Sequence, residues 1–462
     1  MSKEKSAKSI EDWSPEEGRW DSKLSHKTGM ITTFNLGLAF ATWFLASALA
    51  PKLQGLGFKL TQNELYWITA MPGLAGGFLR ILWMFLPPIL GTRKLVTLTT
   101  LLLLVPIIGW GMAVQNPETS FKHFLLLAFL SGIGGGAFSG FMPSTSYFFP
   151  KRMQGTTLGL QAGLGNFGVS FVQFLTPWIV GFSLVGVMGS AQKFKDPTTG
   201  VVADAWYQNA AYFYIPFIVI GALLAWTILK DVPIQANFRK QLDIFGNIDT
   251  LWMTLLYMMT FGIFSGLSAQ FGLLIKNIFG AGNEDIVKIV DGTRTLLVSG
   301  YSVPDVAKYA FLGPLVGAAA RIVFAPLTDK FGGAPWTMVS GAGIIGSILF
   351  TMQHVNPDIS QGATYLSSEF HYFLYGMISI FLFAGIGNAS TFKQMPMIFP
   401  PRQAGGVIGW VSSIAAFGPF LFGMGLVAFQ ASTFLGILAA YSFICLIITW
   451  LRYAKPGAAK KS

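Results

Sequence analysis

The chain has 462 residues, of which 53% are hydrophobic and only 11% are charged. Soluble domains carry about 25% charged residues, so this composition excludes an ordinary soluble protein and indicates a chain that crosses a membrane many times. A single cysteine excludes a disulfide framework and a cysteine-based metal centre, and four scattered histidines show no metal-ligand spacing. We therefore expect no metal and no cofactor.

Residues 1–29 are polar and charged, and they lack the apolar core of a cleavable signal peptide. Beyond them, apolar windows of about 20 residues predict about twelve spanning helices. These lie near residues 30–50, 65–88, 95–114, 123–149, 156–182, 207–229, 250–275, 307–327, 336–352, 372–399, 404–429 and 431–451. The fold class is therefore an all-α integral membrane protein.

A hydrophilic stretch from Lys230 to Asn247 divides the predicted helices into six and six. We expect two six-helix bundles joined by a cytoplasmic linker and flanked by cytoplasmic tails. The five segments are the tail 1–29, the bundle 30–229, the linker 230–248, the bundle 249–452 and the tail 453–462.

The net charge of +11 would suggest nucleic acid binding in a soluble protein, but here the basic residues lie mainly in loops and tails. We expect the lipid bilayer as a partner and no nucleic acid. Basic residues are concentrated on the side of the two termini, which predicts that both termini are cytoplasmic. Lys193, Lys195 and Lys288 lie on the opposite side, so the bias is incomplete.

Two arginines stand inside apolar stretches at matching places in the two halves. Gly91 follows Arg80 by 11 residues, and Gly332 follows Arg321 by the same 11. Each half also contains, in the same order, a Gly-Ile-Gly, a Met-Pro and a Phe-Pro block, at 132–134, 142–143 and 149–150 and at 385–387, 395–396 and 399–400. Chance similarity between glycine-rich apolar segments is a poor explanation for three blocks that agree in the two halves. A parallel duplication with a site at midplane is typical of many secondary transporters.

The charges well inside the predicted helices are Arg80, Arg321 and Lys393, and no Asp or Glu accompanies them. A charge at the bilayer centre costs about 3 kcal/mol on insertion scales, so each arginine is a candidate for function. A guanidinium offers forked donors that suit an oxyanion, which favours one anion site between the halves. The alternative is that each arginine binds backbone carbonyls or a cytoplasmic aspartate and locks a gate. Lys393 fits a site lysine and a snorkelling lysine equally well.

Two glycine-rich segments complete the set of candidates, one opening the fifth predicted helix and one in the tenth. The first contains Gly163, Gly165 and Asn166, and the second contains Ser390 and Thr391. Glycines alone more often indicate close helix packing. The amide and hydroxyl groups shift the balance towards a polar cavity, because buried polar groups need partners.

These two segments, with an arginine in the second and eighth helices, resemble the signature of the nitrate/nitrite porter family (NarK-type) of the major facilitator superfamily. The blocks Ile10–Glu16, Phe149–Arg152 and Tyr257–Gly262 are also similar to that family, and the resemblance covers essentially the whole chain. Asn388 and Lys393 depart from the best-known members, which carry a serine and a neutral residue there.

The resemblance implies that Arg80 and Arg321 clamp the anion, that Asn166 and Tyr257 are neutral donors, and that aromatic rings line the pocket. The rings are those of Phe40, Phe138 and Phe261, although ordinary core packing explains any one phenylalanine among 42 equally well. It also implies nitrate and nitrite as partners and the bacterial inner membrane as the location. The oligomeric state stays open and is compatible with a monomer.

Three functions remain open at this point. Exchange of nitrate for nitrite by alternating access is favoured, because an empty site with two uncompensated positive charges is costly to close. Nitrate/proton symport usually needs a titratable group in the membrane, and the histidines at 123, 354 and 371 lie near helix ends, which leaves Lys393 as the candidate. A nitrate receptor without transport is the third. The predicted helices contain no set of residues typical of a catalytic site, so we expect that the protein is not an enzyme.

Overall fold

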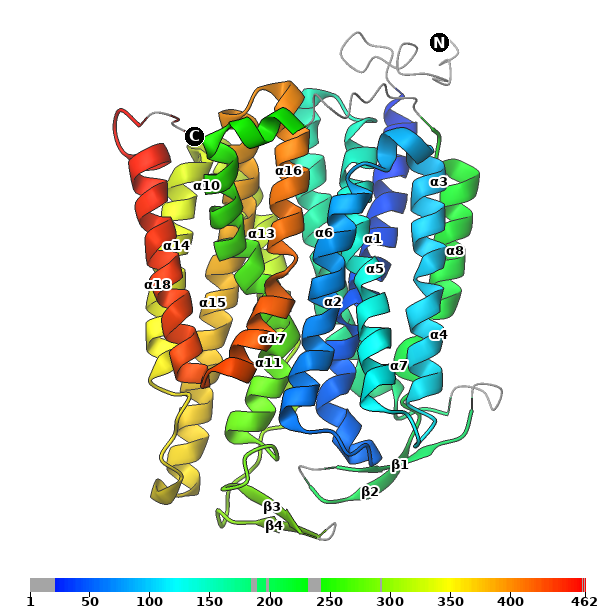
Figure 1. Ribbon diagram of the computed structural model, residues 1–462, viewed down its shortest axis with the longest axis vertical. Helices are drawn as coiled ribbons and strands as arrows, with labels where there is room; N and C mark the ends of the chain where they lie inside the picture. Colours follow the sequence, from blue (N-terminus) through cyan, green and yellow to red (C-terminus); the bar gives the residue numbers. More distant parts are fainter. Residues whose placement is uncertain are drawn as a thin grey trace.

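The computed structural model describes residues 21–183, 189–196, 199–231, 242–290, 293–458, 460 and 462. Most of the predicted N-terminal tail, including the block Ile10–Glu16, and most of the predicted linker lie outside these residues. The described chain forms a bundle of long, roughly parallel helices (Figure 1).

Eleven helices of the described residues are long and apolar enough to cross a membrane. A twelfth, α6, occupies the place of the fifth predicted helix, although its buried Gln161, Asn166 and Gln173 lower its hydropathy. The first six crossings are α1 (Ser22–Leu53), α2 (Gln62–Trp83), α3 with α4 (Pro87–Leu102 and Leu104–Ala113), α5 (Phe121–Ser146), α6 (Lys151–Ile179) and α7 with α8 (Asn209–Tyr212 and Tyr214–Ile228). The prediction of twelve helices is confirmed.

The last six crossings follow the short helix η3 (Leu242–Gly246). They are α10 with α11 (Ile248–Tyr257 and Ile263–Phe279) around the π-helical turn η4 (Met258–Gly262), α12 with α13 (Val306–Tyr309 and Leu312–Phe331), α14 (Gly333–Met352), α15 (Ala363–Ile398), α16 with α17 (Pro401–Ala415 and Gly418–Ala428) and α18 (Ala431–Thr449), which continues as η6 (Trp450–Ala454). The short helices η2 (Gln54–Leu56) and η5 (Ile359–Gln361) lie in connections.

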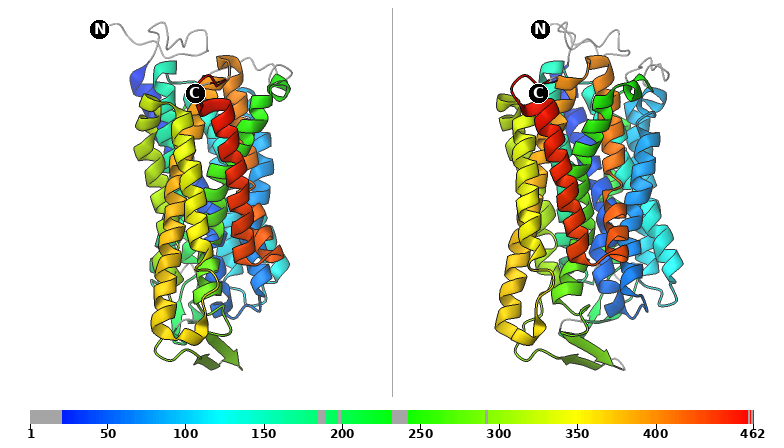
Figure 2. Two further views of the ribbon diagram at one scale, coloured as in Figure 1. Left: turned by 90° about the vertical axis from the view of Figure 1, so that its left-hand side faces the viewer. Right: turned by 60° about the vertical axis from the view of Figure 1, so that its left-hand side comes forward.

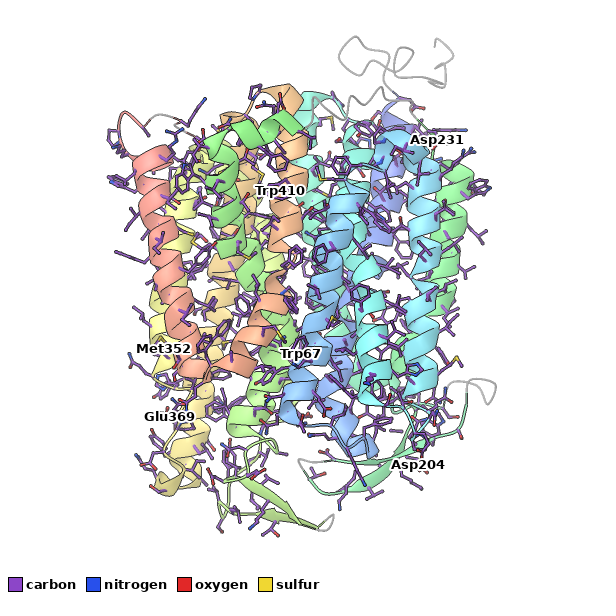
Figure 3. The ribbon with its side chains drawn as sticks, viewed as in Figure 1. Trp67, Asp204, Asp231, Met352, Glu369 and Trp410 are labelled. Carbon is purple, nitrogen blue, oxygen red and sulfur yellow. The ribbon has the colours of Figure 1, made fainter. Side chains whose placement is uncertain are left out.

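Two β-hairpins lie at the end of the bundle opposite to the C-terminus and to the start of α1 (Figure 1). In each hairpin the strands pair antiparallel; they are β1 (Gln192–Lys195) with β2 (Val202–Ala205) and β3 (Val287–Val290) with β4 (Thr293–Leu296). Figure 2 shows the second hairpin projecting beyond the helix ends. We call this end the outer end. Asp204 and Glu369 lie towards it, whereas Asp231 lies at the other end (Figure 3).

The duplicated glycine blocks pack in the same way in both halves. A β-carbon at Gly132 would lie 2.4 Å from a side chain of α2, and one at Gly134 would lie 2.0 Å from a backbone oxygen of α1. At the matching places, a β-carbon at Gly385 would lie 2.2 Å from a backbone oxygen of α13, and one at Gly387 would lie 2.3 Å from a side chain of η4. Small residues allow this close approach of helices. Two duplicated six-helix bundles are thus confirmed.

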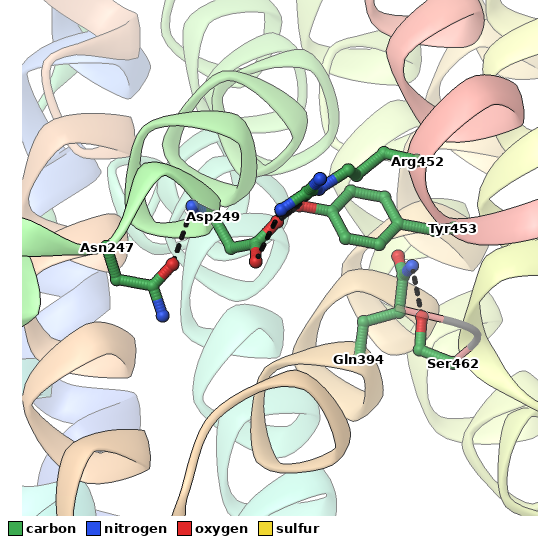
Figure 4. Close-up of polar contacts among 6 residues, drawn as sticks. All are labelled: Asn247, Asp249, Gln394, Arg452, Tyr453 and Ser462. Carbon is green, nitrogen blue, oxygen red and sulfur yellow. Dashed lines mark hydrogen bonds and ion pairs between the residues drawn. The ribbon is translucent and has the colours of Figure 1, made fainter. Parts of the chain in front are cut away.

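Figure 4 shows how the C-terminal bundle is tied together at the end that carries the C-terminus. The Asp249 carboxylate in α10 accepts hydrogen bonds from Arg452 Nε at 2.9 Å, from Arg452 Nη2 at 3.2 Å and from the Tyr453 hydroxyl at 2.9 Å. Gln394 Nε2 donates to Ser462 Oγ at 2.9 Å. The first and last helices of this bundle are therefore joined by an ion pair.

Gly91 and Gly332, which are equally spaced from the two arginines, both have a left-handed φ, of 75° and 87°. A residue with a β-carbon is strained there by about 1–2 kcal/mol. We expect Gly332→Ala to lower the free energy of unfolding by about that amount, as measured by thermal unfolding in detergent. Gly346→Ala is the matched control, because a β-carbon there meets nothing within 4 Å and its φ is not left-handed. Equal stability of the two variants would contradict the expectation.

Candidate functional site

Arg80 lies in α2 and is fully buried, with 0% of its surface exposed. Its Nε donates to the Gly135 carbonyl of α5 at 2.8 Å, and its Nη1 donates to the Ser412 carbonyl of α16 at 2.9 Å. The second contact joins the two halves. The alternative in which an arginine binds backbone carbonyls therefore holds in part for Arg80. Its Nη2 is buried without a hydrogen-bond partner.

Arg321 lies in α13 at the matching place and is 1% exposed. Its Nη2 donates to the Tyr257 hydroxyl at 3.4 Å, and its Nη1 is buried without a partner. A buried donor without an acceptor costs about 1–3 kcal/mol, and more when it is charged. Both guanidiniums therefore retain unsatisfied N–H groups that an anion can satisfy.

Aromatic rings surround both arginines and connect them. The centre of the Arg80 guanidinium lies 4.6 Å from the Phe138 ring, and that of Arg321 lies 5.1 Å from the Phe392 ring. The centroids of these two rings are 6.3 Å apart. Arg80 also faces the rings of Phe40 at 5.8 Å, Trp43 at 5.0 Å and Phe261 at 5.2 Å. We call these five residues, together with Tyr257, the aromatic cluster.

The predicted rings of Phe40, Phe138 and Phe261 are thus brought together around Arg80. Sequence reasoning missed Trp43 and Phe392. The available signals were their positions: Trp43 lies three residues after the predicted Phe40, and Phe392 lies within the second glycine-rich segment. Nothing in the residue types alone separates them from other aromatic residues in the core.

The π-helical turn η4 positions two members of the cluster. It follows Tyr257 directly and contains Phe261, and the two rings stack with centroids 5.4 Å apart and planes 5° apart. Single π-helical turns inside α-helices occur frequently at functional sites. The turn keeps the Tyr257 hydroxyl against Arg321 while Phe261 faces Arg80. No pattern in the sequence predicts this π-helical turn.

Two buried amides lie on helices that flank the cluster. Asn166 in α6 and Asn388 in α15 are fully buried, and neither amide nitrogen nor amide oxygen has a partner. Asn388 lies one helical turn before Phe392 and so on the same face of α15. Buried amides are nearly always hydrogen-bonded, so these two amides are candidates for contact with a polar ligand. Asn166 was predicted as a donor, whereas the sequence marked Asn388 only as a departure from the family.

The four small residues predicted at the site serve packing in this structure. A β-carbon at Gly163 would lie 2.4 Å from Ile322, the neighbour of Arg321, and one at Gly165 would lie 2.8 Å from Leu36. The remaining two make hydroxyl contacts: Ser390 with Thr337 at 2.7 Å, and Thr391 with the Gly387 carbonyl at 2.6 Å. These contacts pack the helices around the cluster, and the binding roles predicted for the four residues stay predictions.

Lys393 makes an ion pair with Asp329, with Nζ 2.6 Å from the carboxylate oxygen. The two side chains are 31% and 39% exposed, unlike the sealed arginines. The structure therefore pairs Lys393 with an aspartate, and a contact of Lys393 with the anion stays a prediction.

The structure corrects the count of charges inside the helices. Because α10 begins at 248 and α15 at 363, Asp249 and Glu369 are buried carboxylates, and because α11 extends to 279, Lys276 is a buried cation. Both carboxylates are paired, Asp249 with Arg452 at 2.9 Å and Glu369 with His354 at 2.8 Å. Among the described residues, neither arginine of the cluster has a carboxylate within ion-pair distance.

Comparison with known proteins identifies the family. Residues 31–423 match the family model of the Major Facilitator Superfamily. The chain is 54% identical to the probable nitrate/nitrite antiporter NarK2 of Thermus thermophilus, over 99% of both chains. It is 31% identical to the nitrate/nitrite transporter NarU of Escherichia coli, over 98% of this chain and 97% of that one. The chain belongs to the nitrate/nitrite porter family of the major facilitator superfamily.

Among solved structures, the proton:xylose symporter XylE shares the fold, with a TM-score of 0.63, 12% identity, and coverage of 96% of this chain and 98% of that one.

Proposed function

We propose that this porter exchanges nitrate for nitrite across the membrane by alternating access. The observation that carries the proposal is a pair of buried guanidiniums in one aromatic cluster, each with an unpartnered Nη and neither paired with a carboxylate of the described part of the chain. The similarity to NarK2, a probable nitrate/nitrite antiporter, and to NarU, a nitrate/nitrite transporter, supports nitrate and nitrite as the substrates.

The chemistry of the cluster suits a small planar monoanion. Two forked guanidiniums bind oxygens directionally and keep their charge at any physiological pH. The rings of Phe138 and Phe261 lie against Arg80 and supply apolar surface, and the unpartnered buried amides of Asn166 and Asn388 are candidate neutral donors. Nitrate and nitrite share this shape and charge, so one site accepts both.

Exchange follows from the cost of closing an empty site. Without an anion, Arg80 and Arg321 hold two positive charges in a site sealed from water, and an uncompensated buried charge is strongly unfavourable. A bound monoanion lowers that cost, so the loaded carrier reorients more readily than the empty one. We take the segments 30–229 and 249–452 as the two moving halves, with the site between them.

The runner-up function is nitrate/proton symport. The observation in its favour is the partly buried pair of Glu369 and His354, which joins a carboxyl and an imidazole at 2.8 Å. Glu369 lies towards the outer end of the C-terminal bundle (Figure 3). Glu369→Gln is therefore the variant that separates the two functions.

The test is nitrate uptake by the purified protein in proteoliposomes. Exchange predicts that internal nitrite stimulates uptake strongly, that a pH gradient has no effect, and that Glu369→Gln retains the stimulation. Uptake that needs the gradient and is lost in Glu369→Gln would establish symport instead. Saturable nitrate binding without any flux would leave only a receptor and contradict both transport functions.

We place the porter in the bacterial inner membrane with both termini in the cytoplasm. Support comes from the basic residues on that side of the chain and from the common end of the bundle where α1 begins and Ser462 lies (Figure 1). The outer end, with both β-hairpins, then faces away from the cytoplasm.

Tyr257→Phe tests the neutral donor of the site. The Tyr257 hydroxyl accepts a hydrogen bond from Arg321 and keeps its own proton for an anion oxygen. We expect its loss to raise the half-saturation concentration for nitrate about fivefold, since one such bond contributes about 1 kcal/mol. Tyr375→Phe is the control, because Tyr375 is 59% exposed on α15. An unchanged half-saturation concentration in Tyr257→Phe would remove Tyr257 from the site.

A further inference from the structure

A buried lysine lies where the two halves meet at the outer end, in addition to the two buried arginines of the aromatic cluster. Lys276 is in the last turn of α11 and is only 3% exposed. Its Nζ donates to the side-chain oxygen of Gln54 in η2, directly after α1. The bond therefore joins the C-terminal half to the N-terminal half.

Further polar contacts between the halves lie beside this bond. Asn277 Nδ2 donates to the Tyr66 hydroxyl at 3.0 Å, and Lys52 pairs with Asp305 at 3.7 Å. Others join Gln62 to the Gly282 carbonyl, Thr69 to Gln270 at 2.7 Å, and Gln173 to the Ser268 carbonyl at 2.8 Å. We call this set the outer lock. It holds the halves together at the outer end in this structure.

Lys276 has an amide oxygen as its partner where a buried ammonium ordinarily has a carboxylate. Among the described residues, no carboxylate lies within ion-pair distance of it. The neighbouring Lys52 adds a second positive charge to the same region, and the carboxylate of Asp305 is paired with Lys52. The carbonyl end of α11 offsets only part of the cost of this burial.

Opening of the outer end separates η2 and α2 from α11 and so breaks these bonds. Lys276 then loses the Gln54 oxygen, while the amide of Asn277 and the hydroxyl of Tyr66 lose each other. One ammonium and two neutral donors then become available together at the outer end. We call this place, once the outer end is open, the outer mouth. A small oxyanion is the ligand that satisfies all three.

We propose that Lys276 is a further anion-binding residue, which holds nitrate or nitrite at the outer mouth while the outer lock is open. The inference rests on the proposed function, since it assigns a second position to the same substrates. The alternative is that Lys276 only fastens the outer lock. The two roles differ in sidedness: a mouth site acts on anions arriving from the outer face alone, whereas a fastener changes how often the outer end opens.

The experiment measures exchange in right-side-out and in inverted membrane vesicles, with nitrate supplied to one face at a time. Lys276→Gln keeps a neutral hydrogen-bond donor at this position but removes the charge. We expect it to raise the half-saturation concentration at the outer face about fivefold, as the loss of one hydrated charge contact implies, and to leave the inner face unchanged. Added salt should weaken outer-face uptake less in the variant than in wild type. Lys276→Arg should restore the wild-type values.

Gln54→Ala is the matched control, because it breaks the same bond but keeps the ammonium. We expect it to leave the outer-face half-saturation concentration near wild type. If Gln54→Ala and Lys276→Gln behave alike, or if Lys276→Gln changes both faces or neither in protein that purifies as a single species, the mouth site is wrong. If wild-type protein fails to exchange nitrate for nitrite, the proposed function fails first, and this inference fails with it.

Discussion

Exchange of nitrate for nitrite is expected to fall at least about 100-fold in Arg321→Lys and in Arg80→Lys, because each arginine makes two kinds of contact that lysine cannot make together. Arg80 holds the carbonyls of Gly135 and Ser412 and still has Nη2 free, and Arg321 holds Tyr257 and still has Nη1 free. A compact ammonium lacks this planar fork. Hydrogen bonds to charged groups contribute about 1.5–3 kcal/mol each, which accounts for a loss of this size.

The measurement is counterflow in proteoliposomes, with protein amounts matched by size-exclusion chromatography. Arg93→Lys is the control of the same chemistry, since Arg93 is 38% exposed and pairs with Asp231 outside the aromatic cluster. It should retain most of the wild-type rate. Normal flux in either cluster variant would overturn the clamp, and equal losses in all three variants would point to a general defect of stability.

Removal of Arg452 is expected to destabilise the porter more than any other change outside the site. Arg452→Met leaves the Asp249 carboxylate, which is 1% exposed, with the Tyr453 hydroxyl as its remaining side-chain partner. Breaking one side of a buried pair costs about 3–5 kcal/mol. We expect about 3 kcal/mol, because Arg452 is one-third exposed and water already reaches it.

Thermal unfolding in detergent checks this value. The double variant Asp249→Asn with Arg452→Met removes both charges and keeps an acceptor for the Tyr453 hydroxyl, so it should recover most of the lost stability. If Arg452→Met unfolds at the wild-type temperature, the ion pair in Figure 4 contributes nothing measurable, as many exposed pairs do. If the double variant is no better than the single one, the loss comes from packing of the Arg452 stem.

The two arginines and their duplication could be predicted from the sequence because a charged residue stands out in an apolar stretch. The equal spacing from the arginines to Gly91 and Gly332 indicates a repeat, and both glycines share a left-handed φ in the structure. The aromatic cluster was predictable only in part. From the sequence alone, Phe392 and Trp43 cannot be told apart from ordinary core residues. The contacts of Phe392 with Arg321 and of Trp43 with Arg80 each join two different helices.

Residue types alone were enough to predict the twelve helices, the two halves and the two buried arginines, because apolar length and a charge in an apolar stretch are read directly from the sequence. Which charges stay unpaired depends on the tertiary structure. It extended helices far enough to bury Asp249, Glu369 and Lys276, gave the carboxylates their partners, and turned Lys393 towards Asp329. Pairing depends on where helices from distant parts of the chain approach each other, and no local pattern of residues encodes that distance.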